Sequence, residues 1–189
     1  MALVRSTRLN ILLVVALALS TAIIGLQARY IRILQTGDER LPPVEPHVGM
    51  SMPPLDVSDS VGHHVLLSYS ATRQPTLIYV FRPGCSWCEA NSGAVNWLTT
   101  HIANTYRVIG LSLSEDGLAD FMRAHAMRFP VYRSPSPSTI DSYHLRTTPE
   151  TIVVSSAGIV LGVWRGAYME VTKTDIEKFF SVSLPEKLK

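Results

Sequence analysis

The stretch Thr76-Leu-Ile-Tyr-Val-Phe-Arg-Pro-Gly-Cys-Ser-Trp-Cys-Glu89 decides how the rest of the chain is interpreted. Its first part, Thr76 to Phe81, is β-branched, aromatic and almost wholly apolar, which predicts a strand buried on both faces of a sheet. Pro83-Gly84 follows directly and ends that strand. A buried strand, a turn and a pair of cysteines therefore come in that order.

A helical period follows the turn. Small and apolar residues recur at steps of four, namely Ala90, Ala94, Leu98 and Ile102. We expect a helix that opens at Cys85 and holds Cys88 one turn further on, about 5–6 Å away, a separation that a disulfide tolerates. The free N–H groups and the dipole at the helix N-terminus stabilise a thiolate at Cys85, and the thiolate is the nucleophile in disulfide exchange.

Composition limits the function classes. The chain has 189 residues and is 47% hydrophobic, which indicates one domain of ordinary size with an appendage. Its net charge is +2. The cations are scattered, which argues against nucleic-acid binding. Both cysteines lie in the one motif, and no histidine pair is spaced to complete a zinc site with them. We expect no metal and no cofactor, and the alternative for the pair is two buried, inert thiols.

An uncharged apolar segment, Ile11 to Leu26, follows Arg5 and Arg8 near the N-terminus. Counted from Leu9, the span is longer than a signal-peptide h-region of about 7–15 residues and close to the lower limit for crossing a bilayer. We expect residues 1–27 to be a membrane anchor; the alternative is a cleaved signal peptide and a secreted domain. The arginines favour an N-in orientation, which places the domain on the extracytoplasmic side.

The next part of the chain predicts a linker and a hairpin. Residues 28–54 mix charges and prolines, which is typical of a semi-rigid linker. Leu55 to Ser70 predicts a small hairpin with Gly62 in its turn. His63 and His64 flank this turn, and adjacent strand side chains point to opposite faces, so we interpret them as turn residues and not as ligands of one metal.

The residues after the cysteine helix predict an α/β sheet. Arg107 to Leu113 is a second apolar run, and the order strand, helix, strand makes a right-handed parallel crossover. Ser114 is expected to cap a further helix with Glu115 and Asp116 in its first turn. Phe129-Pro-Val131 is expected to return to the sheet edge.

The last third of the chain predicts a short helix, two strands and a final helix. The short helix is expected around Thr139 to Leu145. Residues 147–154 and 159–164 predict an antiparallel pair of strands joined by a turn. Thr174-Asp-Ile-Glu177 fits a capping box, which predicts that the final helix begins there.

From about Met52 to Ser181 the chain resembles the thioredoxin superfamily, and most closely its membrane-anchored, extracytoplasmic members of the TlpA/ResA type. The matching features stand in the family's order: the hairpin with Gly62, the strand ending at Phe81, Cys85-Ser86-Trp87-Cys88, Phe129-Pro-Val131, Thr148-Pro149 before a strand, and Gly158 in the closing turn. The resemblance implies an α/β thioredoxin-like fold, with a central mixed sheet flanked by helices and an extra N-terminal hairpin. The domain would cover residues 55–183, with a tail over residues 184–189.

The resemblance also implies roles for the site residues. Cys85 would attack and Cys88 would resolve. Pro149 would be cis and, with Thr148, would form the platform that pairs with the substrate chain; the alternative is an ordinary trans turn proline. Trp87 would contribute to partner contact as an exposed aromatic residue beside the thiols.

Three departures from the family pattern bear on mechanism. Ser86-Trp87 stands where thioredoxins commonly have Gly-Pro, and this dipeptide tunes thiol pKa and reduction potential, so the direction of electron flow stays open. The buried aspartate of thioredoxin corresponds here to Tyr79. Glu89, next to Cys88, is a candidate for the missing proton acceptor; the alternative is a solvated glutamate that complements the helix dipole.

The leading hypothesis is a membrane-tethered thiol:disulfide oxidoreductase that acts on extracytoplasmic proteins with cysteine pairs. We expect a reductant, for example of apocytochromes with a C-x-x-C-H site in cytochrome c maturation, recharged by a membrane electron donor. One alternative is the same chemistry in reverse, a disulfide-donating oxidase. Another is a thioredoxin-like binding or assembly module without redox turnover.

Overall fold

The computed structural model of the chain describes residues 14–29 and 45–185. Two compact units are present, Met1–Pro42 and Pro43–Lys189. In the first unit, residues 14–29 form a helix with exposed side chains. No helix in the described part of the chain is both long enough and apolar enough to cross a membrane. Residues 1–13, which begin the predicted anchor, lie outside the described residues.

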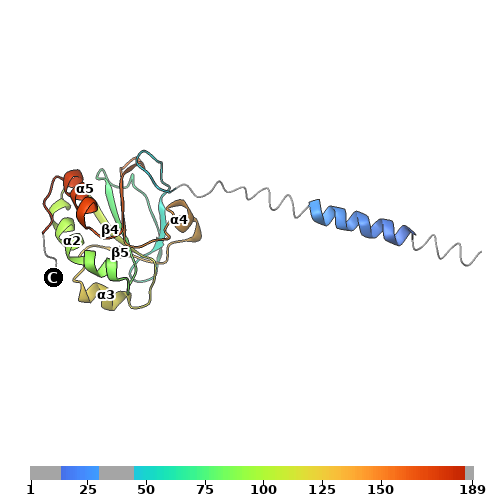
Figure 1. Ribbon diagram of the computed structural model, residues 1–189, viewed down its shortest axis with the longest axis horizontal. Coiled ribbons are helices and arrows are strands. Elements are labelled where there is room, and N and C mark those ends of the chain that lie inside the picture. Colours follow the sequence, from blue (N-terminus) through green and yellow to red (C-terminus); the bar gives the residue numbers. More distant parts are fainter. Residues whose placement is uncertain (1–13, 30–44, 186–189) are drawn as a thin grey trace, which may run out of the picture. The chain divides into compact units, whose positions relative to one another are not determined.

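A five-stranded mixed sheet forms the centre of the second unit (Figure 1). Its strands are β3 (Thr76–Phe81), β4 (Arg107–Ser112), β5 (Val131–Tyr132), β6 (Glu150–Val154) and β7 (Val160–Arg165). The strand order is β5-β4-β3-β6-β7, with β3, β4 and β5 parallel and β6 and β7 antiparallel to their neighbours. Every residue of the central strand β3 is buried, which explains its nearly continuous apolar sequence.

The predicted hairpin is confirmed as a separate two-stranded sheet of β1 (Leu55–Ser58) and β2 (His64–Leu67). Backbone hydrogen bonds join it to the residue after β5. The Ser58 N–H donates to the Arg133 carbonyl oxygen at 2.8 Å, and the Arg133 N–H donates to the Ser58 oxygen at 2.9 Å. The hairpin is thus fixed to the sheet edge.

The chain that precedes the hairpin belongs to the folded unit, which corrects the prediction that the linker runs to residue 54. The Gly49 N–H donates to the Val160 oxygen at 2.9 Å, and the Met52 N–H donates to the Gly158 oxygen at 2.7 Å. Met52 is buried. We call residues 45–54 the strap. It pairs with the outer side of β7, so the domain begins before residue 55.

Helices cover both faces of the sheet (Figure 1). On one face lie α2 (Ser86–Ile102), α3 (Leu118–Ala124) and α5 (Glu170–Phe180), which share an apolar core with Phe81 and Val153. On the other face lies α4 (Pro137–Ser142). Here Ile152 and Val154 of β6 pack with the strap and the hairpin in a second core. The alternation along β6 is the two-residue period of a strand.

Two predicted helix starts are wrong. Helix α3 begins after Gly117, which has a left-handed φ of 69°, and Ser114 does not cap it. Helix α5 begins at Glu170, so Thr174 lies inside it and donates its hydroxyl to the Glu170 oxygen at 3.1 Å. Glu177 instead accepts from the Leu184 N–H at 2.7 Å. Both stretches match capping sequences, but neither helix has a capping hydrogen bond from a side chain. Serine, threonine and glutamate also form hydrogen bonds inside helices and in turns, so the sequence pattern alone does not locate a cap.

Candidate active site

The turn after β3 places Cys85 at the N-terminus of α2. Gly84 adopts a left-handed φ of 73°, a conformation that glycine reaches without steric cost. Cys85 is the N-cap residue, and its sulfur accepts a hydrogen bond from the Cys88 N–H at 3.3 Å. The Glu89 N–H donates to the Cys85 carbonyl oxygen at 3.0 Å. The predicted placement of both cysteines on this helix is confirmed.

The Cys85 thiol is more acidic than a free thiol. Partial burial acts to raise its pKa, but hydrogen bonds outweigh that effect and hold the pKa below its ordinary value. These come from the side chains of Cys88 and Thr148 and from the N–H groups of Cys88 and Trp87. The dipole of a helix N-terminus favours the same charge. A thiolate is therefore easier to form here than on an unperturbed cysteine.

Cys88 has the opposite character. Its side chain is fully buried, and that burial raises the pKa of the Cys88 thiol to about 12. The hydrogen bond with Cys85 adds to the increase. One helical turn thus carries an accessible, acidified thiol and an enclosed thiol that stays protonated near neutral pH.

The Thr148–Pro149 peptide bond is cis, as the resemblance implied. The Thr148 backbone contacts the Cys85 sulfur, because the Cys85 thiol donates to the Thr148 carbonyl oxygen at 3.7 Å. Behind it, the Gly166 N–H donates to the Pro149 oxygen at 2.8 Å. The structure therefore brings together Cys85 and the two residues predicted as the substrate platform.

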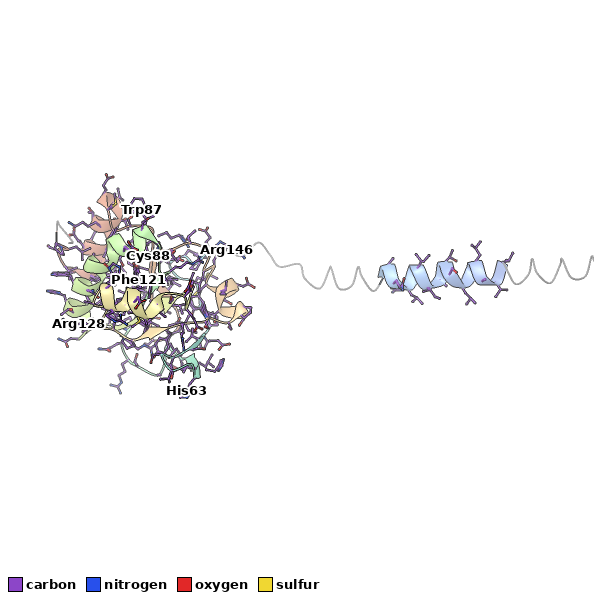
Figure 2. The ribbon with its side chains drawn as sticks, turned by 90° about the horizontal axis from the view of Figure 1, so that it is seen from below. His63, Trp87, Cys88, Phe121, Arg128 and Arg146 are labelled. Atoms are coloured by element: carbon purple, nitrogen blue, oxygen red, sulfur yellow. The ribbon has the colours of Figure 1, made fainter. Side chains whose placement is uncertain are left out.

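Trp87 and Glu89 are both exposed in the first turn of α2. Trp87 is 54% exposed, the state that its predicted role in partner contact requires. The role of Glu89 as proton acceptor stays a prediction. Figure 2 shows Trp87 and His63 at opposite ends of the domain, so the adjacent histidines are not part of the thiol site. In the described part of the chain, no three acidic, histidine or cysteine side chains form a group suited to a metal ion.

Comparison with known proteins gives a match at the level of structure. No family model matches the sequence, and no curated protein matches it significantly. A Chlorobium tepidum protein assigned as the thiol:disulfide interchange protein DsbE is similar at 20% identity and a TM-score of 0.62, over 72% of this chain and 97% of that one. The chain has the thioredoxin fold.

Two further neighbours share this thioredoxin fold. The thioredoxin domain of a thiol-disulfide oxidoreductase from Bacteroides vulgatus matches with a TM-score of 0.59 and 17% identity, over 71% of this chain and 98% of that one. StoA from Bacillus subtilis matches with a TM-score of 0.54 and 14% identity, over 69% and 98% of the two chains. The predicted mixed sheet flanked by helices is confirmed, and identities this low establish the fold alone.

Within the thioredoxin fold, the space beneath Cys88 holds a set of neutral polar side chains that we call the neutral cluster: Tyr79, Asn91, Thr151 and Tyr168. The Tyr79 hydroxyl donates to the Cys88 carbonyl oxygen at 3.4 Å. The hydroxyls of Thr151 and Tyr168 lie 2.5 Å apart. Burial holds the pKa of both tyrosines well above the ordinary value, so they stay uncharged near neutral pH.

The opposite face of the sheet holds ionisable side chains, which we call the charged cluster: Glu45, His144, Glu150 and Arg165. Glu150 is 1% exposed, and burial raises its pKa to about 7 although Arg165 opposes the change. The Arg165 Nε lies 3.0 Å from Glu150 Oε1 as an ion pair. Neither oxygen of Glu150 accepts an aligned hydrogen bond from the described residues.

Apart from Tyr79, the sequence analysis identified no member of either cluster as part of the site, although each cluster left a signal. Asn91 falls on the buried stripe of α2 with Val95 and Leu98, whereas Ala90, which was assigned to that stripe, is exposed. Glu150 follows Pro149 directly and opens a strand that is otherwise apolar or β-branched. A polar residue that interrupts a buried pattern was the available indication in both cases.

Proposed function

We propose that the protein is a thiol:disulfide oxidoreductase that exchanges disulfides with other proteins through Cys85 and Cys88. The observation that supports this most is the contrast within one helical turn: Cys85 is accessible with a lowered pKa, and Cys88 is buried with a raised one. Structural, inert cysteines are usually buried, whereas Cys85 lies at a helix N-terminus, accessible and next to the cis-proline Pro149.

In the reducing direction the Cys85 thiolate attacks one sulfur of a partner's disulfide. The partner's S–S bond breaks, a mixed disulfide forms, and the departing thiolate takes a proton. Cys88 then loses its proton and attacks the Cys85 sulfur, which releases the second thiolate of the partner. The partner gains two electrons and two protons, and the protein keeps a Cys85–Cys88 disulfide.

The same proposal assigns roles to the surrounding residues. The backbone at Thr148 and Pro149 pairs with the partner chain next to its disulfide, and exposed Trp87 adds apolar contact. Glu89 is retained as the candidate acceptor for the Cys88 proton. A membrane dithiol donor returns two electrons to the pair after each turnover.

We further propose that the domain works on the extracytoplasmic side as a member of the TlpA/ResA type. The uncharged run from Ile11 to Leu26 behind Arg5 and Arg8 supports targeting to the membrane, as an anchor or a cleaved signal. Partners would be extracytoplasmic proteins with cysteine pairs, and apocytochromes are one such class.

Two other functions fit parts of the site. A disulfide-donating oxidase uses the same atoms in reverse, and Ser86-Trp87 between the cysteines leaves that direction open. A binding module without redox turnover uses the platform and Trp87 alone. Full cellular function of a Cys85→Ala variant would favour the binding module.

Trapping the intermediate tests the proposal. Cys88→Ser removes the resolving thiol, so the mixed disulfide at Cys85 should accumulate in cells as adducts that a reducing agent releases. Cys85→Ser is the matched control and should trap nothing, because the acidified thiol is gone. Equal adducts in both variants, or none in either, would count against Cys85 as the nucleophile.

A further inference from the structure

Asn91 is a buried amide whose polar atoms both bond to one loop. The residue is 2% exposed and lies in the second turn of α2, three residues after Cys88. Its Nδ2 donates to the Gly166 carbonyl oxygen at 3.2 Å, and its Oδ1 accepts from the Tyr168 N–H at 2.8 Å. Residues 166–169 connect β7 to α5, and we call the first three of them, residues 166–168, the clamped loop.

The clamped loop is also bonded to the strand that carries the substrate platform. The Gly166 N–H donates to the Pro149 oxygen at 2.8 Å, and the Tyr168 hydroxyl lies 2.5 Å from the Thr151 hydroxyl. Asn91 thereby joins the helix of the two thiols to the platform through a closed set of hydrogen bonds. Among the described residues, Asn91 provides the side-chain hydrogen bonds that link α2 to the clamped loop. Removing its amide group removes this link.

The position of the loop places it in reach of a bound partner. Trp87 precedes Asn91 by four residues, so the two share a face of α2. The residue after the loop, Met169, is 53% exposed, and Trp87 is 54% exposed. Because Gly166 of the loop bonds directly to Pro149, a partner chain that pairs with the platform at Pro149 would pass close to the clamped loop.

We propose that Asn91 is a positioning residue for partner binding, which rests on the proposed exchange of disulfides with proteins. It fixes the clamped loop against the Cys85 helix and the Pro149 platform, so that the partner meets a surface already in its bound shape. Preorganisation of this kind lowers the entropic cost of binding. Asn91 carries no charge, and its side chain also hydrogen-bonds that of Tyr79 in the neutral cluster. Its bonds to the clamped loop act on affinity for the partner chain.

The test compares three forms of the full-length protein: wild type, Asn91→Leu and Thr99→Val. Leucine has the same number of side-chain non-hydrogen atoms as asparagine and the same branching, but it cannot bond the loop. Thr99 is the matched control, because it is buried on the same helix and, among the described residues, its hydroxyl bonds to the Asn96 oxygen of that helix and not to the loop. Each form is assayed with a disulfide-bonded peptide, which spans the platform, and with hydroxyethyl disulfide, which has no peptide backbone.

For Asn91→Leu we expect KM for the peptide to rise about tenfold while kcat stays within about twofold, as for loss of binding interactions alone. The rate with hydroxyethyl disulfide, which makes no contact with the loop, should fall by a smaller factor than kcat/KM for the peptide, and the pH midpoint of Cys85 alkylation should not change. Hydrogen exchange of the Tyr168 amide should speed up about tenfold or more, because its acceptor is gone. Thr99→Val should match wild type in all four readouts.

An unchanged peptide KM in Asn91→Leu, or equal losses with both substrates, would overturn the inference. If wild type itself reduces neither substrate, the proposed function has failed, and unchanged exchange at Tyr168 would then overturn the role of Asn91 separately. If Asn91→Leu does not fold, Tyr168→Phe carries the test. It keeps the ring and cuts the loop from Thr151, so peptide KM should rise by a smaller factor, and no rise would contradict the inference.

Discussion

Thr151 and Glu150 are neighbours on β6, yet they face opposite kinds of surroundings. Thr151 points to the α2 side and joins the neutral cluster beneath Cys88. Glu150 points to the side of the strap and joins the charged cluster. The neutral cluster consists of uncharged groups with hydrogen-bond partners, whereas the charged cluster contains a buried carboxylate whose oxygens lack aligned donors among the described residues.

The neutral cluster and the charged cluster differ in how they respond to pH. Because the neutral cluster does not ionise near neutral pH, the acidity of Cys85 is set by the helix N-terminus and its hydrogen bonds. The group that titrates near neutral pH lies on the far side of the sheet, directly after Pro149. The two thiols and the pH-sensitive group therefore lie on opposite faces of the sheet, and we expect that each can be changed alone.

The largest effect is expected from opening a hole in the neutral cluster. Tyr79 is fully buried and its ring stacks on Phe81. Tyr79→Ala should lower the free energy of unfolding by about 3–5 kcal/mol, the usual cost of deleting a large buried ring. Tyr79→Phe keeps the ring and should lose only about 1 kcal/mol. Urea unfolding measures both, and equal losses in the two variants would contradict a mainly structural role for the ring.

The next effect belongs to the charged cluster and depends on pH. The folded-state pKa of Glu150, about 7, exceeds the ordinary 4.5, so its stabilisation is complete below about pH 4.5 and is lost as pH rises through 7. The free energy of unfolding should fall by up to about 3 kcal/mol across this window. In Glu150→Gln the free energy of unfolding should change much less across this pH window, because glutamine does not titrate.

Urea unfolding at a series of pH values measures this change. Asp116→Asn, which alters an exposed carboxylate, is the control and should keep the wild-type pH dependence. A Glu150→Gln profile parallel to that of wild type would place the titrating group elsewhere.

The two thiols provide a third comparison. At pH 7, iodoacetamide should modify Cys85 at least about tenfold faster than Cys88, because thiolate content and access both favour Cys85. Mass spectrometry of the digested protein separates the two sites. Glu150→Gln should leave the pH midpoint for Cys85 unchanged, and a shift of that midpoint would show that the two faces of the sheet are coupled.

The smallest effect is expected at the edge of the charged cluster. Glu45 is 62% exposed and lies 3.4 Å from Arg165. Glu45→Gln should change the free energy of unfolding by less than about 1 kcal/mol, as for other exposed ion pairs. It should also lower the pKa of Glu150, because the nearby negative charge that raises it is removed. Carboxyl NMR titration measures the direction, and an increase would contradict this arrangement.

The sequence predicted the parts of the fold that follow from local patterns. Strand β3 and the helix start at Cys85 could be read directly, because an apolar run, Pro-Gly and a helical period adjoin there. The start of α5 was misplaced, because Thr174 and Glu177 satisfy a capping pattern that tertiary packing overrides. The strap was taken for linker, because its pairing with β7 joins residues more than 100 positions apart, and no local signal reports such pairing.

The candidate site divides in the same way. Cys85 and Cys88 follow from spacing, and Thr148-Pro149 followed from the family likeness. Asn91 and Glu150 depend on which face of an element each residue occupies, and that is set by packing against segments distant in sequence. Polar residues on an otherwise buried stripe are the feature to look for in such cases.

The measurement that tests the central claim most directly is the reduction potential of the Cys85/Cys88 pair in the full-length protein, by equilibration in thiol buffers of known poise. The account predicts an internal disulfide that forms with a single midpoint near that of thioredoxin, about −270 mV, as suits a reductant. A midpoint near about −120 mV would reverse the direction to that of an oxidase. Failure to form an internal disulfide at any poise would contradict the redox account and leave the binding module in its place.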